Sequence, residues 1–103
     1  MERMTFANVG KLGVKPGKRD QLVEILTRQS AEMGEHGCLL YEVGVNDDEP
    51  DAVFVSELWE SADAHASSLE LESVRAAIAE AMSLLSGEMD GYRFEVVGSP
   101  LRP

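Results

Sequence analysis

Residues 52–71 read AVFVSELWESADAHASSLEL, and within this stretch a strand-like pattern gives way to a helical one. Apolar side chains follow the spacing of a strand as far as Trp59. Ser61 can then cap a short helix that contains His65. The only tryptophan of the chain and one of its two histidines therefore lie at a strand-to-helix junction.

Two interpretations of this pair are open. A flat apolar ring beside a group that titrates near neutrality could form a pocket that binds an aromatic molecule and moves a proton. Alternatively, Trp59 is a core residue and His65 lies on a helix surface, as single aromatics and lone histidines commonly do. From these residues alone, the structural interpretation is favoured.

Outward from this junction, strands and helices alternate along the chain. Hydrophobic periodicity predicts strands over 6–14, 38–45, 52–59 and 92–97, and main helices over 19–35 and 71–85. A capping box of Ser67 and Glu70 is expected to start the second main helix, and Ser86 with Gly87 to end it. This order predicts an α+β, ferredoxin-like fold, an antiparallel sheet with its helices on one face.

The predicted strands are apolar on both faces, although the helices can cover only one. Val53 and Val55 point one way, while Phe54 and Leu58 point the other. A second apolar face left in water is an aggregation liability. Packing it against the same face of another copy predicts a homodimer of the kind called a dimeric α/β-barrel.

Length and charge narrow the possible roles. The chain has 103 residues, which predicts a single domain over 1–103 with a loose tail at 98–103. Its net charge of −10 argues against a nucleic-acid partner and against an anionic membrane surface. No apolar run is long enough to span a bilayer, residues 1–5 lead into no signal-peptide core, and Cys38 has no disulfide partner. These features predict a cytoplasmic protein.

Sequence motifs for common cofactors are missing. Gly17-Lys18 does not belong to a phosphate loop, no glycine-rich dinucleotide fingerprint follows a strand, and no paired cysteines suggest zinc or iron–sulfur. The acidic segment 46–51 lacks the glycine and final glutamate of a calcium loop and is interpreted as a solvated turn. His36 is interpreted as a cation near a helix end. No metal site is expected.

The candidate site lies between the helices and their face of the sheet. Glu57 and Trp59 share a strand face, and His65 can swing over it. Asn8 interrupts an apolar alternation, so it is either a polar residue at a strand end with no role in the pocket or a residue that lines the pocket and forms a hydrogen bond there. Further aromatic surface is available, but the sequence does not show which rings face the pocket; the candidates are Phe6, Tyr41, Phe54, Tyr92 and Phe94.

Several of these residues resemble the antibiotic biosynthesis monooxygenase family, especially its quinol monooxygenases. The resemblance runs from about Phe6 to Val97, and its main motif is Glu-x-Trp-Glu-Ser at 57–61 with histidine six residues after the tryptophan; further matches lie at 37–41, 54–56, 64, 68, 69, 71, 74 and 78. The resemblance implies a ferredoxin-like homodimer. It also implies oxidation of polycyclic phenols or quinols by O2, with no metal or flavin cofactor.

On this resemblance His65 is the base, Trp59 stacks on the substrate ring, and Asn8 or Glu57 orients an oxygen atom or the imidazole. Tyr41 and Phe54 add substrate-binding surface. Haem degraders of this fold pair a first-strand asparagine with a tryptophan and a later histidine. Here the asparagine is shifted and the histidine comes too early, which disfavours haem. An isomerase or cyclase using the same base, and a non-catalytic small-molecule-binding dimer, remain open alternatives.

Overall fold

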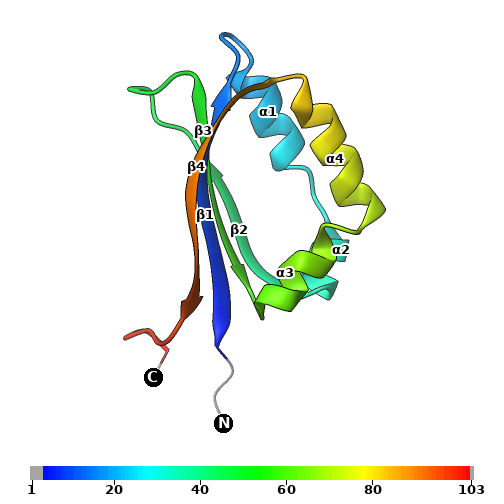
Figure 1. The fold of residues 1–103 in the computed structure, drawn as a ribbon, viewed down its shortest axis with the longest axis vertical. Coiled ribbons are helices and arrows are strands. Elements are labelled where there is room, and N and C mark those ends of the chain that lie inside the picture. The colour runs from blue at the N-terminus through cyan, green and yellow to red at the C-terminus, as the bar shows by residue number, and fades with distance from the viewer. Residues whose placement is uncertain (1–3, 103) are drawn as a thin grey trace.

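The computed structural model describes residues 4–102, so Met1–Arg3 and Pro103 of the predicted N-terminal segment and tail lie outside the described residues. The elements are, in order, β1 (Thr5–Val14), α1 (Arg19–Leu26), α2 (Ala31–Glu35), β2 (Cys38–Gly44), β3 (Ala52–Trp59), α3 (Ala62–Ser68), α4 (Glu72–Met82) and β4 (Leu85–Val96). The strands form one antiparallel sheet in the order β2-β3-β1-β4, with the helices on one face (Figure 1). This confirms the ferredoxin-like α+β fold.

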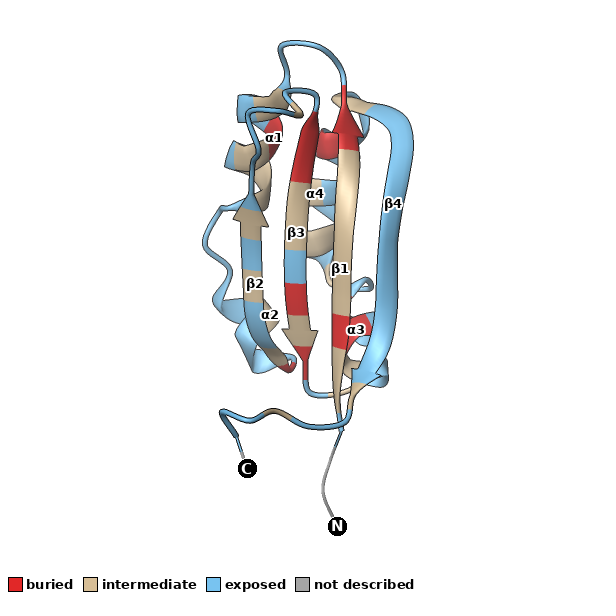
Figure 2. Cartoon of the chain, turned by 90° about the vertical axis from the view of Figure 1, so that its left-hand side faces the viewer, coloured by how far each residue is buried: buried red, intermediate tan, exposed pale blue. Residues whose placement is uncertain are grey.

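The densest part of the core lies at one end of the sheet. Val14 of β1, Leu22 of α1, Val53 of β3 and Ala81 of α4 form a buried cluster. Figure 2 shows the buried ends of β1 and β3 side by side at this end. Apolar burial there holds α1 and α4 on the sheet, so the opposite end of the helix–sheet layer does not have to be filled to the same extent.

The prediction of one continuous helix over 19–35 is wrong. The structure contains two shorter helices: α1 ends at Leu26, and the Thr27 hydroxyl and backbone N–H both donate to the Val23 carbonyl, at 2.7 and 3.0 Å. Ser30 then has an extended backbone, and its Oγ accepts from the N–H of Met33 at 3.4 Å, so it caps α2. Hydrophobic spacing alone does not reveal this break.

The helical region after β3 agrees with the prediction in part. Ser61 caps α3 as expected, since its Oγ accepts from the N–H of Ala64 at 3.0 Å. The capping box of Ser67 and Glu70 is wrong, because Ser67 lies inside α3 and its carbonyl accepts from the Glu70 N–H at 3.0 Å. Leu71 precedes α4 without any side-chain cap.

The last strand begins earlier than predicted. Ser86 and Gly87 lie within β4, so the expectation that they end a helix is wrong. The segment that precedes Tyr92 is rich in polar residues and glycine, which disfavour strands. It is held instead by pairing with β1 through a register shift, where Gly87 has a φ of 98°. A side chain at Gly13 would collide with β4, because its Cβ would lie 2.4 Å from Ser86 Oγ.

The sheet face turned away from the helices carries apolar side chains, and Figure 2, which views the sheet from that side, shows β4 and much of β2 as exposed. Leu40, Tyr92 and Phe94 are 38%, 71% and 49% exposed. Phe54 and Leu58 lie between them on the same face. Among residues 4–102, no helix combines the length and apolarity required to cross a bilayer.

Leu22→Ala is expected to lower the free energy of unfolding by about 2–5 kcal/mol, because Leu22 is fully buried and a cavity would remain. Urea denaturation at fixed protein concentration measures the change. Leu101→Ala, at a residue that is 89% exposed, is the matched control and should stay within about 0.5 kcal/mol. Equal losses in the two variants would contradict this assignment of the core.

Candidate active site

A cavity of about 750 Å³ lies between the sheet and the helices. Every helix and strand contributes to its wall. The apolar lining includes Leu26, Met33, Val55, Val74, Ile78 and Met82. The polar lining includes Asn8, Tyr41, Glu57, His65, Ser68 and Arg93. A largely apolar hollow with a few converging polar groups is the usual form of a small-molecule site.

Four of the polar residues form one row across the sheet. In the strand register, Tyr41 pairs with Glu57, Glu57 with Asn8, and Asn8 with Arg93. Laterally paired residues point to the same face, and all four line the cavity on the helix side. The order β2-β3-β1-β4 therefore brings residues 41, 57, 8 and 93 together despite their separation in the chain.

Glu57 is the centre of this arrangement. Its Oε2 accepts a hydrogen bond from Asn8 Nδ2 at 2.8 Å, and its Oε1 accepts one from Trp59 Nε1 at 2.9 Å. The residue is only 9% exposed, so these two donors stabilise a carboxylate that would otherwise be costly to bury. Asn8 therefore forms a hydrogen bond at the wall of the cavity.

His65 lies beside this carboxylate and between two aromatic rings. Its Nε2 is 3.9 Å from Glu57 Oε1. Its ring centroid is 5.4 Å from that of Trp59, edge-on, and 5.5 Å from that of Phe6. With 7% of its surface exposed, His65 is not the surface histidine of the structural interpretation. Trp59, at 1%, is the core residue which that interpretation expected, and it also lines the cavity.

The surroundings shift the pKa values of His65 and of Tyr41 in the row. Burial lowers the pKa of His65; the nearby Glu57 carboxylate opposes this effect and the Arg93 charge adds to it. The imidazole is therefore neutral at pH 7 and able to accept a proton. Burial, together with the charge of Glu57, raises the pKa of Tyr41 to about 12. Its phenol keeps its proton and can donate a hydrogen bond.

Both the sequence and the fold of the chain match known proteins. The family model described as "Antibiotic biosynthesis monooxygenase" matches residues 5–80. The chain belongs to this family. A crystal structure titled "putative Antibiotic biosynthesis monooxygenase", from Chloroflexus aurantiacus J-10-fl, is 35% identical with a TM-score of 0.80, covering 92% of this chain and 95% of the other.

Two more distant structures share the fold of the family. One from Nitrosomonas europaea, titled a "Putative antibiotic biosynthesis monooxygenase", is 11% identical with a TM-score of 0.81 and 94% of each chain covered. One with a corresponding title from Caulobacter crescentus CB15 is 20% identical with a TM-score of 0.76, covering 93% of this chain and 92% of the other. No curated protein matches the chain.

The structure of this antibiotic biosynthesis monooxygenase family member brings together five of the six predicted site residues: Asn8, Tyr41, Glu57, Trp59 and His65. Phe54 is the exception. It pairs with Lys11 and Gly44 on the sheet face away from the helices, so it does not line the cavity. The reason is the period-two alternation, which turns Phe54 away from Glu57 and Trp59.

Phe6 is one of the aromatic residues whose orientation the sequence left open, whereas Arg93 was not among the predicted site residues. Phe6 contacts the imidazole, and Arg93 stands at the β4 end of the polar row. The sequence feature that could have pointed to Arg93 is its position as a single charged residue between Tyr92 and Phe94. Its importance could not be recognised until the face of β4 that it occupies was known.

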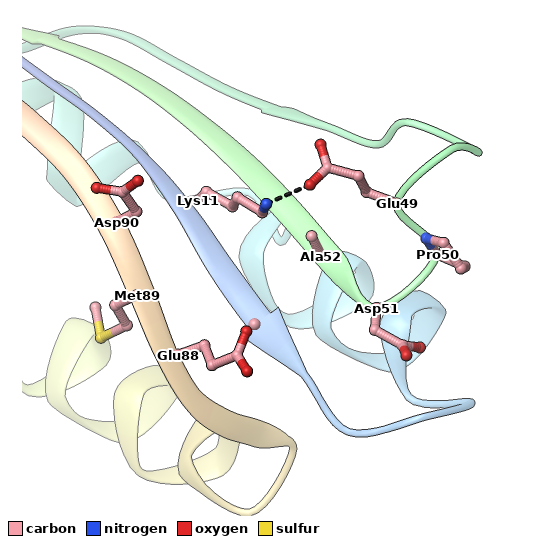
Figure 3. Close-up of a pocket in the computed structure, with 9 residues that line it drawn as sticks. Lys11, Glu49, Pro50, Asp51, Ala52, Glu88, Met89 and Asp90 are labelled. Atoms are coloured by element: carbon pink, nitrogen blue, oxygen red, sulfur yellow. Dashed lines mark hydrogen bonds and ion pairs between the residues drawn. The ribbon is translucent and has the colours of Figure 1, made fainter.

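A second pocket, of about 490 Å³, lies along the strands near the β2–β3 loop (Figure 3). Its charged lining comprises Lys11, Glu49, Asp51, Glu88 and Asp90, with an ion pair between Lys11 and Glu49. It contains neither a histidine nor an aromatic ring. Within residues 4–102, no three His, Cys, Asp or Glu side chains are arranged to hold a metal ion. The polar row is therefore the stronger candidate for chemistry.

Glu57→Gln is expected to lower the pKa of His65 further, because it removes the negative charge that favours the imidazolium. The NMR titration of the His65 ring should move to lower pH than in the unmodified protein, whose own midpoint should lie below 6.5. Glu42→Gln, on an exposed part of β2, is the control and should leave the titration in place. A midpoint that rises in Glu57→Gln would contradict the assigned charge interaction.

Proposed function

We propose that this chain is a cofactor-independent monooxygenase that oxidises a phenolic or quinol-type aromatic molecule with O2. The main support is the neutral, buried imidazole of His65, 3.9 Å from the Glu57 carboxylate at the wall of an apolar cavity of about 750 Å³. Membership of the antibiotic biosynthesis monooxygenase family agrees with the reaction class.

The proposed chemistry begins with a proton transfer. His65 takes the proton of the substrate hydroxyl, and Glu57 stabilises the resulting imidazolium. The phenolate is a far better reductant than the phenol, so it can transfer electrons to O2. One oxygen atom then bonds to the ring carbon as a peroxide. Loss of the ring hydrogen and cleavage of the O–O bond leave a quinone carbonyl, and the second oxygen departs as water after taking protons, including the one held by His65.

The other residues of the site would position these groups. Tyr41 keeps its proton, with its pKa at about 12, and can donate a hydrogen bond to a substrate oxygen. Trp59 is only 1% exposed, so its part is to hold Glu57 and the edge of His65 in place more than to stack on the substrate. Asn8 fixes the other oxygen of Glu57. Apolar helix residues such as Val74 would cover part of the phenolate.

Oxygen uptake by metal-free protein should exceed autoxidation with some members of a panel of hydroquinones, naphthols and anthrone-like phenols. His65→Ala should reduce the rate by about 10²–10⁴, the usual contribution of a positioned base. His36→Ala is the matched control, since His36 lies outside the cavity and should leave the rate unchanged. An unchanged rate in His65→Ala would contradict the role of this base.

Two other results of the same assay would replace the proposed reaction. Turnover of a substrate without oxygen would indicate an isomerase or cyclase that uses the same base. Ligands that raise the melting temperature without any turnover would indicate a small-molecule-binding protein. Cytoplasmic residence and the lack of a nucleic-acid partner stay predictions from composition.

We propose further that the chain forms a homodimer through the open face of the sheet. Apolar side chains from all four strands lie on this face; they include Val9, Leu40, Phe54, Leu58, Tyr92 and Phe94. Burying them against a second copy would remove this surface from water. Because the face lies across the sheet from the cavity, dimerisation would leave the helix side free.

Light scattering is expected to give twice the chain mass of 11.2 kDa for the unmodified protein. Phe94→Glu should shift the protein toward the monomer, because it places a charge within an apolar contact. Val45→Glu, at another exposed apolar residue, is the control and should remain dimeric. An unmodified protein that is monomeric at micromolar concentrations would refute the dimer.

A further inference from the structure

We propose that Arg93 binds an anionic group of the substrate, so that the site selects a hydroxylated aromatic molecule that carries a carboxylate. This inference deepens the proposed function and rests on it for the placement of the hydroxyl group at His65. It adds a specificity-determining residue at the opposite end of the polar row.

Arg93 is placed to contact a ligand in the cavity. It lies on edge strand β4, pairs with Asn8 across the register and lines the cavity. The row continues from Asn8 to Glu57, which lies next to His65. Two strand spacings separate β4 from β3, which is about 10 Å. A fused two-ring aromatic acid with its hydroxyl and carboxylate at opposite ends matches this spacing between Glu57, beside His65, and Arg93.

The guanidinium has no competing partner among the described residues. Within residues 4–102, Arg93 forms no hydrogen bond or ion pair, whereas Arg28 binds Glu80 at 2.6 and 3.2 Å and Arg19 lies 3.5 Å from Asp47. Both oxygens of Glu57 are already occupied by Asn8 and Trp59. The donors of Arg93 are therefore available to a ligand.

The charge of the surroundings strengthens the argument. The chain has a net charge of −10, so an anionic molecule needs a local cation in order to bind. Among the described residues that line the cavity, Arg93 is the only permanent cation. Of the other charged lining groups, Glu57 is paired and Asp90 accepts a hydrogen bond from the Gly91 N–H at 2.9 Å. A planar guanidinium binds a carboxylate through two parallel hydrogen bonds.

The test is a binding measurement that needs no turnover. Isothermal titration calorimetry compares 6-hydroxy-2-naphthoate with its methyl ester, which has the same rings and hydroxyl but no charge. The unmodified protein should bind the acid at least 10-fold more tightly than the ester, as expected for a charge-assisted contact. Arg93→Gln should abolish this preference, and Arg93→Lys should restore part of it.

The control is Arg75→Gln, which removes an exposed arginine of α4 outside the cavity and should keep the full preference for the acid. Melting temperatures establish that each variant is folded. Equal affinity for acid and ester in the unmodified protein, a preference that survives Arg93→Gln, or no detectable binding of the acid would each overturn the proposal.

Oxygen uptake separates this proposal from the proposed function. If no phenol or quinol consumes O2 but the acid still binds through Arg93, the monooxygenase reaction is wrong and the anion site stands. If Arg93→Gln lowers the turnover rate equally for acid and ester without changing their affinities, Arg93 serves the phenolate itself, and the carboxylate site is wrong.

Discussion

The buried carboxylate of Glu57 is the constraint on which the site depends. A charge in this position requires donors, and Asn8 of β1 and Trp59 of β3 provide one for each oxygen. The same hydrogen bonds fix the tryptophan ring, whose edge then sets the position of His65 on α3. One carboxylate thus connects two strands and a helix, and it leaves a negative charge beside the single buried histidine of residues 4–102.

The dense core and the candidate site lie toward opposite ends of the sheet. At one end, Val14, Leu22, Val53 and Ala81 pack into a dense cluster. Toward the other end, the polar row replaces apolar residues and the helices leave a cavity. Because tight packing at one end secures the helices, the other end tolerates an incompletely filled interior, a buried charge and an imidazole with a lowered pKa.

Much of this arrangement could be predicted because it follows from local rules. The alternation in β3 placed Glu57 and Trp59 on one face. Ser61, as a capping residue, predicted the start of the helix that carries His65. The same alternation turns Phe54 to the opposite face, so its absence from the cavity wall could also have been predicted. Other features depended on competition between local and distant partners. The break between α1 and α2 is marked by the extended Ser30, whose side chain caps α2, and the early start of β4 depends on pairing with β1; hydrophobic spacing reveals neither.

The sequence by itself determined the order of strands and helices, the two apolar faces of the sheet and the meeting of Trp59 with His65, because each depends on periodicity over a few residues. Tertiary structure alone decided that Tyr41, Glu57, Asn8 and Arg93 form one row. Their alignment depends on strand order and register, which are set by packing across the whole sheet. The protonation states of Tyr41 and His65 were decided at the same level, since burial and neighbouring charges shift their pKa values only in the folded chain.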